Sequence, residues 1–279
     1  MDLVRRAHAM TEIARKARTR GRRIGLVPTM GALHEGHLAL VRAARERVDL
    51  CVVSIFVNPT QFGPQEDLAQ YPRDLVRDSD LCITAGVDYV FAPPAEDLYP
   101  PGPPTWVEVE GPSSRFEGAS RPGHFRGVAT VVLKLLHVVQ PHVAVFGRKD
   151  AQQAWIVRRM VQDLHVDTEI VVAPTVRDRD GVALSSRNAY LSSQERAAAG
   201  AIPRALEAAR AARESSAATV DSVVQAACSV LEADGGLRID YLELVEAESF
   251  ERATTLDGER LLLVAVFCGR TRLLDNQAL

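Results

Sequence analysis

The feature that most constrains the fold is an alternation, through the first two-thirds of the chain, of short β-branched runs with longer amphipathic segments. The short runs predict strands at residues 24–29, 50–57, 87–92, 142–146 and 166–174. The longer segments predict helices at residues 38–48, 75–85, 128–139 and 151–164. This β-α-β-α order is typical of an α/β fold: a Rossmann-like, doubly wound parallel sheet with helices on both faces.

The composition changes near residue 192, where an alanine-rich helical pattern replaces the alternation. Further helices are predicted at residues 196–212 and 220–233, and further strands at residues 239–245 and 261–267. We therefore expect a second, smaller α+β domain. The predicted domains are residues 1–175 and 176–279.

Charge and cysteine content exclude several classes of protein. The 279 residues carry a formal net charge of −3 with acids and bases interleaved, so no basic field indicates a nucleic-acid partner. No run of about 18 apolar residues predicts a membrane span. Each cysteine stands alone in the sequence, which disfavours a zinc site or a disulfide framework: Cys51, Cys82, Cys228 and Cys268. These features favour a cytoplasmic protein that acts on small molecules.

The first predicted strand leads into a turn with the sequence PTMGALHEGH, residues 28–37. Metal binding by His34 and His37 is one interpretation, although the His-Glu-x-x-His spacing of zinc proteases is absent. Helix capping is the second. Phosphate binding is favoured, because a helix N-terminus offers N–H groups and a positive dipole end. Gly31 and Gly36 would let the backbone approach a phosphate closely.

Polar segments also follow other predicted strands, at residues 58–62, 147–150 and 185–188. Ligands of a doubly wound sheet bind at the carboxyl ends of its strands, so we expect these segments to converge on one crevice. Four side chains are donors suited to phosphate oxygens: Lys149, Ser185, Ser186 and Arg187. Three amides would orient a hydroxylated substrate: Asn58, Gln61 and Gln153.

Together these residues resemble the pantothenate synthetase family over almost the whole chain. Besides the turn, the similar motifs are SIFVNPTQF (54–62), YPR (71–73), EGASRPGHF (117–125), FGRKDAQQ (146–153), LSSRN (184–188) and TRLLDN (271–276). The family is a nucleotidyltransferase branch of Rossmann-like folds with a His-x-Gly-His turn. The resemblance implies an enzyme that joins (R)-pantoate to β-alanine with ATP and Mg²⁺, through a pantoyl adenylate, and releases pyrophosphate and AMP.

The resemblance also implies the site residues. ATP would be bound by Met30, His34, Gly36, His37, Gly147, Lys149, Asp150, Val176, Leu184, Ser185, Ser186 and Arg187. Catalysis would depend on His34, His37, Lys149, Ser185, Ser186 and Arg187. Pantoate and β-alanine would be bound by Pro28, Thr29, Met30, Asn58, Gln61, Tyr71, Arg121, His124 and Gln153. The first domain would bind ATP and pantoate, the second would close over the active site, and the enzyme would be a homodimer.

Three positions depart from the family pattern. Arg148 and Ala151 stand where the family commonly has an acidic and an aromatic residue. Arg77 and Asp78 stand near the expected Mg²⁺ region, where the family often has two acidic residues. Asp78 is thus the candidate metal ligand, together with triphosphate oxygens and water.

Two other functions remain open. One is a nucleotidyltransferase that adenylylates a phosphate rather than a carboxylate. Gln61 and Gln153 disfavour it, because a phosphorylated substrate would call for basic residues there. The other is a nucleotide-sensing protein that keeps the fold without the reaction, which the presence of His34, His37 and Lys149 disfavours.

Overall fold

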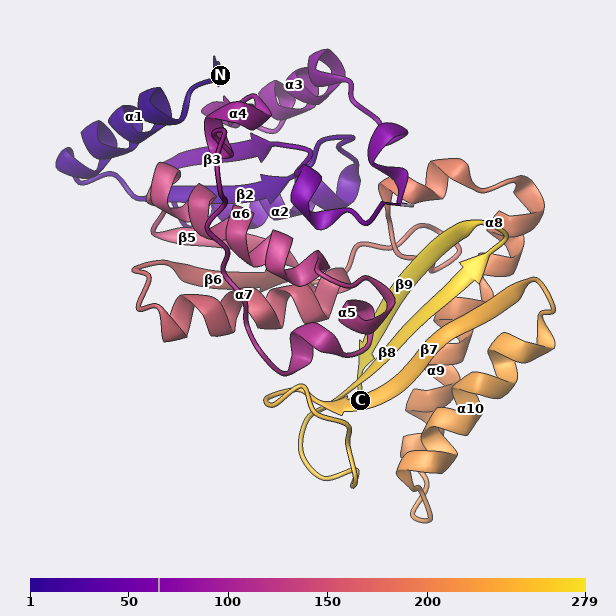
Figure 1. Ribbon diagram of the computed structural model, residues 1–279. Helices are drawn as coiled ribbons and strands as arrows, with labels where there is room; N and C mark the ends of the chain where they lie inside the picture. Colours follow the sequence, from indigo (N-terminus) through magenta and orange to yellow (C-terminus); the bar gives the residue numbers. More distant parts are fainter. Residues whose placement is uncertain (65) are drawn as a thin grey trace. The chain divides into compact units, whose positions relative to one another are not determined.

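The computed structural model describes residues 1–64 and 66–279. These residues form two compact units, whose elements are labelled in Figure 1. Unit 1 comprises residues 1–148 and 153–174, and unit 2 comprises residues 149–152 and 175–279. The short segment of residues 149–152 therefore packs with unit 2, although it lies well inside the first domain that the sequence predicts.

Unit 1 contains a six-stranded sheet in the order β1-β4-β3-β2-β5-β6, and each neighbouring pair is parallel. Its strands are β1 (Asp2–Val4), β2 (Ile24–Thr29), β3 (Leu50–Ile55), β4 (Tyr89–Phe91), β5 (Val143–Gly147) and β6 (Glu169–Ala173). The predicted fold class is confirmed. The short edge strand β1 was not predicted, because three residues are too few to show a period.

Helices cover both faces of this sheet. One layer contains α1 (Ala7–Thr19), α6 (His124–Val139) and α7 (Ala151–Asp163), and the other contains α2 (Glu35–Arg45) and α3 (Leu75–Thr84). The burial of strand β3 explains why its sequence is apolar throughout. Val52 belongs to the core under the first layer and Val53 to the core under the second, so both faces of the strand are buried.

The strand order places a topological switch point between β2 and β5. From β2 the chain proceeds outward to β3 and β4 on one side, and from β5 to β6 on the other. Doubly wound sheets bind ligands beyond the carboxyl ends of the strands at such a point. Thr29 and Gly147 are the last residues of β2 and β5. A ligand site is therefore expected at the segments that follow these two residues.

Unit 2 is an α+β structure, as predicted. Its antiparallel sheet has the order β7-β8-β9, with β7 (Leu237–Glu246), β8 (Arg260–Cys268) and β9 (Thr271–Ala278). Helices α8 (Ser193–Ala199), α9 (Ala201–Arg213) and α10 (Val220–Ala233) complete it, and α9 and α10 pack on the sheet to form its core (Figure 1). The sequence predicts one helix where α8 and α9 meet at Gly200. It does not predict β9.

None of the helices in the described part of the chain combines the length and the hydropathy needed to cross a membrane.

Candidate active site

The turn between β2 and α2 has a left-handed backbone. Gly31 has φ +87° and Ala32 has φ 51°, and a Cβ atom at Gly31 would lie 2.9 Å from Oδ2 of Asp78. Thr29 fixes the start of the turn, because its Oγ1 donates to the carbonyl of Ser54 at 2.7 Å and accepts from the N–H of Gly31 at 3.2 Å. Glycine is therefore required at position 31 for both its conformation and its small size.

The two histidines form a capping box at the start of α2. Nδ1 of His34 accepts from the N–H of Gly36 at 3.1 Å, and Nδ1 of His37 accepts from the N–H of His34 at 3.3 Å. A ring nitrogen that accepts does not carry the proton, so each neutral imidazole is protonated at Nε2. The capping interpretation is thus correct, and it agrees with phosphate binding, because it fixes both rings with Nε2 as their donor.

Asp78, the candidate metal ligand, is hydrogen-bonded to the turn between β2 and α2. Its Oδ2 accepts from the N–H of Ala32 and its Oδ1 from the N–H of Leu33, both at 2.8 Å. The residue is 1% exposed, and burial raises the pKa of its carboxyl group, against the lowering effect of these hydrogen bonds. Both oxygens are used by the turn, so the residue does not fit a direct bond to Mg²⁺. We expect Asp78 to shape the turn rather than to bind the metal.

No group of three or more His, Cys, Asp or Glu that suits a metal ion occurs within residues 1–64 and 66–279.

Strand β3 leads into a second site segment, which packs against the turn. Asn58 caps the 3₁₀ helix Pro59–Gln61 and donates from Nδ2 to Oε1 of Gln61 at 3.0 Å. Gln61 in turn donates from Nε2 to Sδ of Met30 at 3.2 Å. Asn58 is 1% and Gln61 9% exposed. The predicted pantoate residues Met30, Asn58 and Gln61 therefore do lie together, with their amides already oriented.

Arg121 and His124 support this segment from a loop and the start of α6. Arg121 donates to the carboxylate of Glu66 at 2.5 and 3.0 Å, and also pairs with Glu117 at 3.3 Å. Nδ1 of His124 lies 2.8 Å from the carbonyl of Gln61, to which it donates, so Nε2 is the acceptor for Arg121 at 3.2 Å. Each is thus held by protein groups, and its predicted contact with substrate stays a prediction.

The buried His124 predicts a loss of stability in acid. Its pKa is lowered from 6.5 to about 4, first by burial and then by the charge of Arg121. As the pH falls through this window, the unfolded chain binds a proton that the folded protein does not. The free energy of unfolding should then fall by about 3 kcal/mol from this group alone. Urea denaturation followed by tryptophan fluorescence measures it, because both tryptophans lie in unit 1.

The variant His124→Gln supplies the control, since all other titrations remain in it. Between pH 6.5 and 4.5 the wild type should lose about 2 kcal/mol more than the variant does. Equal losses in the two proteins would show that His124 is not kept neutral by the fold.

The remaining predicted residues of unit 1 lie on several elements. Tyr71 is 5% exposed and packs edge-on against Phe62, with 6.1 Å between ring centroids. Pro28 lies in β2, Gly36 in the first turn of α2, Gly147 at the end of β5 and Gln153 in α7. Gly147 has no close neighbour at its Cα, because an added Cβ would find only Leu40, at 4.0 Å. A ligand could therefore approach that backbone.

Unit 2 carries the other predicted donors. Lys149 lies in the 3₁₀ helix Arg148–Asp150, and its Nζ is 3.4 Å from Oδ1 of Asp150. Leu184 pairs its N–H with the carbonyl of Val176 at 3.0 Å, which closes a hairpin. Two serines and an arginine follow directly in the sequence. Ser185 caps the 3₁₀ helix Ser186–Tyr190, and its Oγ accepts from the N–H of Arg187 at 3.3 Å.

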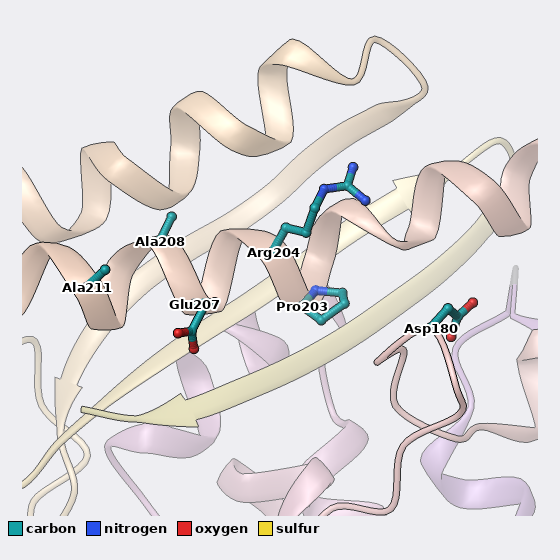
Figure 2. A pocket seen from close by; sticks show the side chains of 6 residues that line it. All are labelled: Asp180, Pro203, Arg204, Glu207, Ala208 and Ala211. Atoms are coloured by element: carbon teal, nitrogen blue, oxygen red, sulfur yellow. The ribbon is translucent and has the colours of Figure 1, made fainter.

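The predicted residues thus divide between the two units, and in unit 1 hydrogen bonds join Met30, Asn58 and Gln61. A surface hollow of about 480 Å³ in unit 2 contains none of them (Figure 2). It is lined by Asp180, Pro203, Arg204, Glu207, Ala208 and Ala211.

Sequence reasoning missed the residues that support the site. Glu66 holds Arg121 from 55 positions away and lies in none of the quoted motifs. Glu117 also holds Arg121, and it begins the motif EGASRPGHF, but the motif alone predicts no role for it. Asp275 and Asn276 belong to one of the family motifs, but the motif alone predicts no role for them.

Comparison with known proteins agrees with these observations. A family model described as Pantoate-beta-alanine ligase matches residues 2–278. The pantothenate synthetase of Moorella thermoacetica is 50% identical over 100% of the chain and 99% of its own length. That of Heliobacterium modesticaldum is 51% identical over 99% of the chain and 98% of its own.

Solved structures are equally similar. The pantothenate synthetase of Thermus thermophilus has a TM-score of 0.94 at 45% identity, with 99% of both chains covered. The pantoate-β-alanine ligase of Francisella tularensis, solved with β-γ ATP and β-alanine, has a TM-score of 0.81 at 34% identity, with 99% of this chain and 97% of its own covered. Because similarity spans the whole chain and both of its units, the chain belongs to the pantoate-β-alanine ligase family.

Proposed function

We propose that the chain is a ligase that joins (R)-pantoate to β-alanine at the expense of ATP. The products are pantothenate, AMP and pyrophosphate, the intermediate is a pantoyl adenylate, and the reaction belongs to coenzyme A biosynthesis. The observation that carries the proposal, within this family, is the turn between β2 and α2. It presents a helix N-terminus and two imidazoles protonated at Nε2 at the switch point of the sheet.

The first step requires charge neutralisation rather than a base. The carboxylate of pantoate is already ionised at neutral pH, and it must be aligned with the α-phosphate of ATP. The proposed donors to the phosphates are His34 and His37 of unit 1 and Lys149, Ser185, Ser186 and Arg187 of unit 2. If about four such bonds each strengthen by about 1 to 2 kcal/mol in the transition state, they lower the barrier by roughly 4 to 8 kcal/mol.

Pantoate would be oriented by amides before the reaction. We assign its hydroxyl and carboxylate groups to Gln61 and Gln153, with Met30 against its apolar part. The hydrogen bond of 3.2 Å between Gln61 and Met30 supports this assignment, because it fixes the amide before substrate arrives. A preoriented, neutral amide discriminates against a phosphorylated substrate, for which a basic residue would be needed.

In the second step the amine of β-alanine attacks the acyl carbon of the adenylate and AMP leaves. No side chain among the site residues is an evident base for the amine. The phosphate of the departing AMP, or a water molecule, would take the proton. This step therefore depends on positioning more than on acid-base groups of the protein.

Mg²⁺, a homodimer and a cytoplasmic location complete the proposal. Mg²⁺ would be held chiefly by the triphosphate oxygens, where it neutralises phosphate charge, since Asp78 is used by the turn. Unit 2 would close over the bound nucleotide. The isolated cysteines of the sequence support the cytoplasm, where thiols stay reduced.

The reaction can be tested directly with purified protein, ATP and Mg²⁺. We expect pyrophosphate release only after pantoate is added, and AMP plus pantothenate once β-alanine follows. Coupled pyrophosphate detection and mass spectrometry of the products measure both steps. Release that ignores pantoate would contradict the proposal and favour another nucleotidyltransferase. Tight ATP binding without any release would instead indicate a nucleotide sensor.

A further inference from the structure

The motif TRLLDN at residues 271–276 has no part in the reaction described above, yet it carries two buried polar residues. Asp275 is 3% and Asn276 5% exposed, and both lie on β9, an edge strand of the sheet of unit 2. Side chains of consecutive residues leave a strand on opposite faces. One strand can therefore reach two different segments. Polar side chains are rarely buried so fully unless they serve as hydrogen-bond partners.

Asn276 holds the main chain of Lys149. Its Nδ2 donates to the carbonyl of Lys149 at 2.9 Å, across 127 positions of sequence. Lys149 sits in the single 3₁₀ turn Arg148–Asp150 between β5 and α7. This side-chain bond thus ties the residue to β9. The bond lies within unit 2, to which residues 149–152 belong.

Asp275 holds the hairpin that leads to Ser185. Its carboxylate accepts two bonds from the guanidinium of Arg177, at 2.5 and 3.0 Å, and Nη1 of Arg177 also donates to the carbonyl of Gly181 at 3.0 Å. The hairpin is closed by the bond from the N–H of Leu184 to the carbonyl of Val176 and by a bridge between Arg177 and Ala183. A bidentate pair with a carboxylate whose side chain is only 2% exposed is a rigid anchor.

The two anchors are joined to each other. The N–H of Asn276 donates to Oδ1 of Asp275 at 2.8 Å, so the same carboxylate that binds Arg177 also orients the backbone of Asn276. Lys149 and the hairpin before Ser185 are therefore fixed to one point of β9. About 35 residues separate Lys149 and Ser185 in sequence, so local structure does not determine their relative position. The bonds to β9 determine it instead.

We propose that Asp275 and Asn276 are positioning residues that hold Lys149 and the segment Ser185-Ser186-Arg187 in a fixed mutual arrangement for phosphate binding. The inference rests on the proposed function, because it assigns these donors to ATP. Neither Asp275 nor Asn276 touches substrate in this scheme. Asn276 acts through the main chain of Lys149, and Asp275 acts through Arg177 and the hairpin that precedes Ser185. The loss of either anchor should therefore slow the chemistry more than it weakens the fold.

The test is a double-mutant cycle between Asn276→Ala and Lys149→Ala. In the wild-type background, Asn276→Ala should slow single-turnover pyrophosphate release about 10-fold at saturating ATP and pantoate, with the KM for pantoate unchanged. In the Lys149→Ala background the same change should cost less than about 2-fold, because the positioned group is already gone. A structural defect would instead lower the rate by the same factor in both backgrounds.

The neighbouring change Gln277→Ala is the matched control, since its side chain donates to the adjacent carbonyl of Ala278 on the same strand. It should leave the rate within about 2-fold. Thermal unfolding checks each variant, and Asn276→Ser replaces Asn276→Ala if the latter does not fold. Equal factors in the two backgrounds overturn the inference. A wild type that releases no pyrophosphate with pantoate would overturn the proposed function instead.

Discussion

Replacing Lys149 with alanine should slow formation of the pantoyl adenylate about 100-fold or more, while the protein stays folded. Lys149 is the one lysine among the proposed phosphate donors, and its main chain is held by Asn276 at 2.9 Å. A preorganised cation of this kind stabilises charge that develops on the phosphates, and its removal is not compensated by water. Single-turnover release of pyrophosphate from ATP and pantoate measures the step.

The composition of the chain sharpens this prediction. Of 33 basic residues only three are lysines: Lys16, Lys134 and Lys149. Lys134 contacts its own fold: it donates to the carbonyl of Leu98 at 2.6 Å and lies 4.3 Å from the ring centre of Tyr99. Where arginine is used almost everywhere else, the compact ammonium of Lys149 suggests a site that a guanidinium does not fit. Lys149→Arg should therefore recover only part of the lost rate.

The three lysines also permit a measurement that does not depend on turnover. A lysine-directed acylating reagent, with the modified peptides identified by mass spectrometry, should label Lys149 more slowly when ATP is present. Lys16 lies in α1, outside the proposed site, and is the internal control. Lys16→Ala should likewise leave adenylate formation unchanged. Equal labelling of Lys149 with and without ATP, together with an unchanged rate in Lys149→Ala, would remove this residue from the mechanism.

The fold could be predicted where burial dictates the sequence. β3 is apolar along its whole length because both of its faces are covered, and that run identifies a central strand without further information. β9 could not be predicted, because its sequence TRLLDNQA includes two buried polar residues whose partners lie elsewhere in the chain. The long-range bonds of these two residues explain why the sequence pattern does not indicate a strand. The same bonds are the basis of the positioning role proposed for β9.

The candidate site was predictable in its residue types but not in their partners. Donors at the carboxyl ends of strands could be recognised from position alone. The sequence could not show that Asp78 binds two backbone N–H groups, since the bonds join residues 45 and 46 positions apart. It likewise could not show that Arg121 is held by Glu66, 55 positions away. The type of a residue indicates which ligand its side chain could bind. Only the fold shows whether other protein groups are already hydrogen-bonded to that side chain.

The substitution Gly127→Ala should destabilise unit 1, although it adds only one methyl group. Gly127 lies in α6 against the segment of Asn58 and Gln61, and an added Cβ would lie 2.4 Å from the carbonyl oxygen of Thr60 and 2.7 Å from its carbon. These are backbone atoms, so no side-chain rotation relieves the contact. Alanine favours a helix over glycine by about 1 kcal/mol, but forcing this backbone apart costs about 3 kcal/mol. The free energy of unfolding should therefore fall by about 2 kcal/mol.

The same change should weaken pantoate binding, because the carbonyl of Gly127 also accepts from Nδ2 of Asn58 at 3.2 Å. Displacing the segment moves the amide of Gln61, and we expect the KM for pantoate to rise about 10-fold while the KM for ATP changes little. Gly147→Ala is the matched control for stability alone, since its Cβ would meet only Leu40 at 4.0 Å. Urea denaturation followed by the fluorescence of the two tryptophans of unit 1 compares the variants. Equal stability of Gly127→Ala and Gly147→Ala, with an unchanged KM for pantoate, would contradict the close contact between α6 and the segment of Asn58 and Gln61.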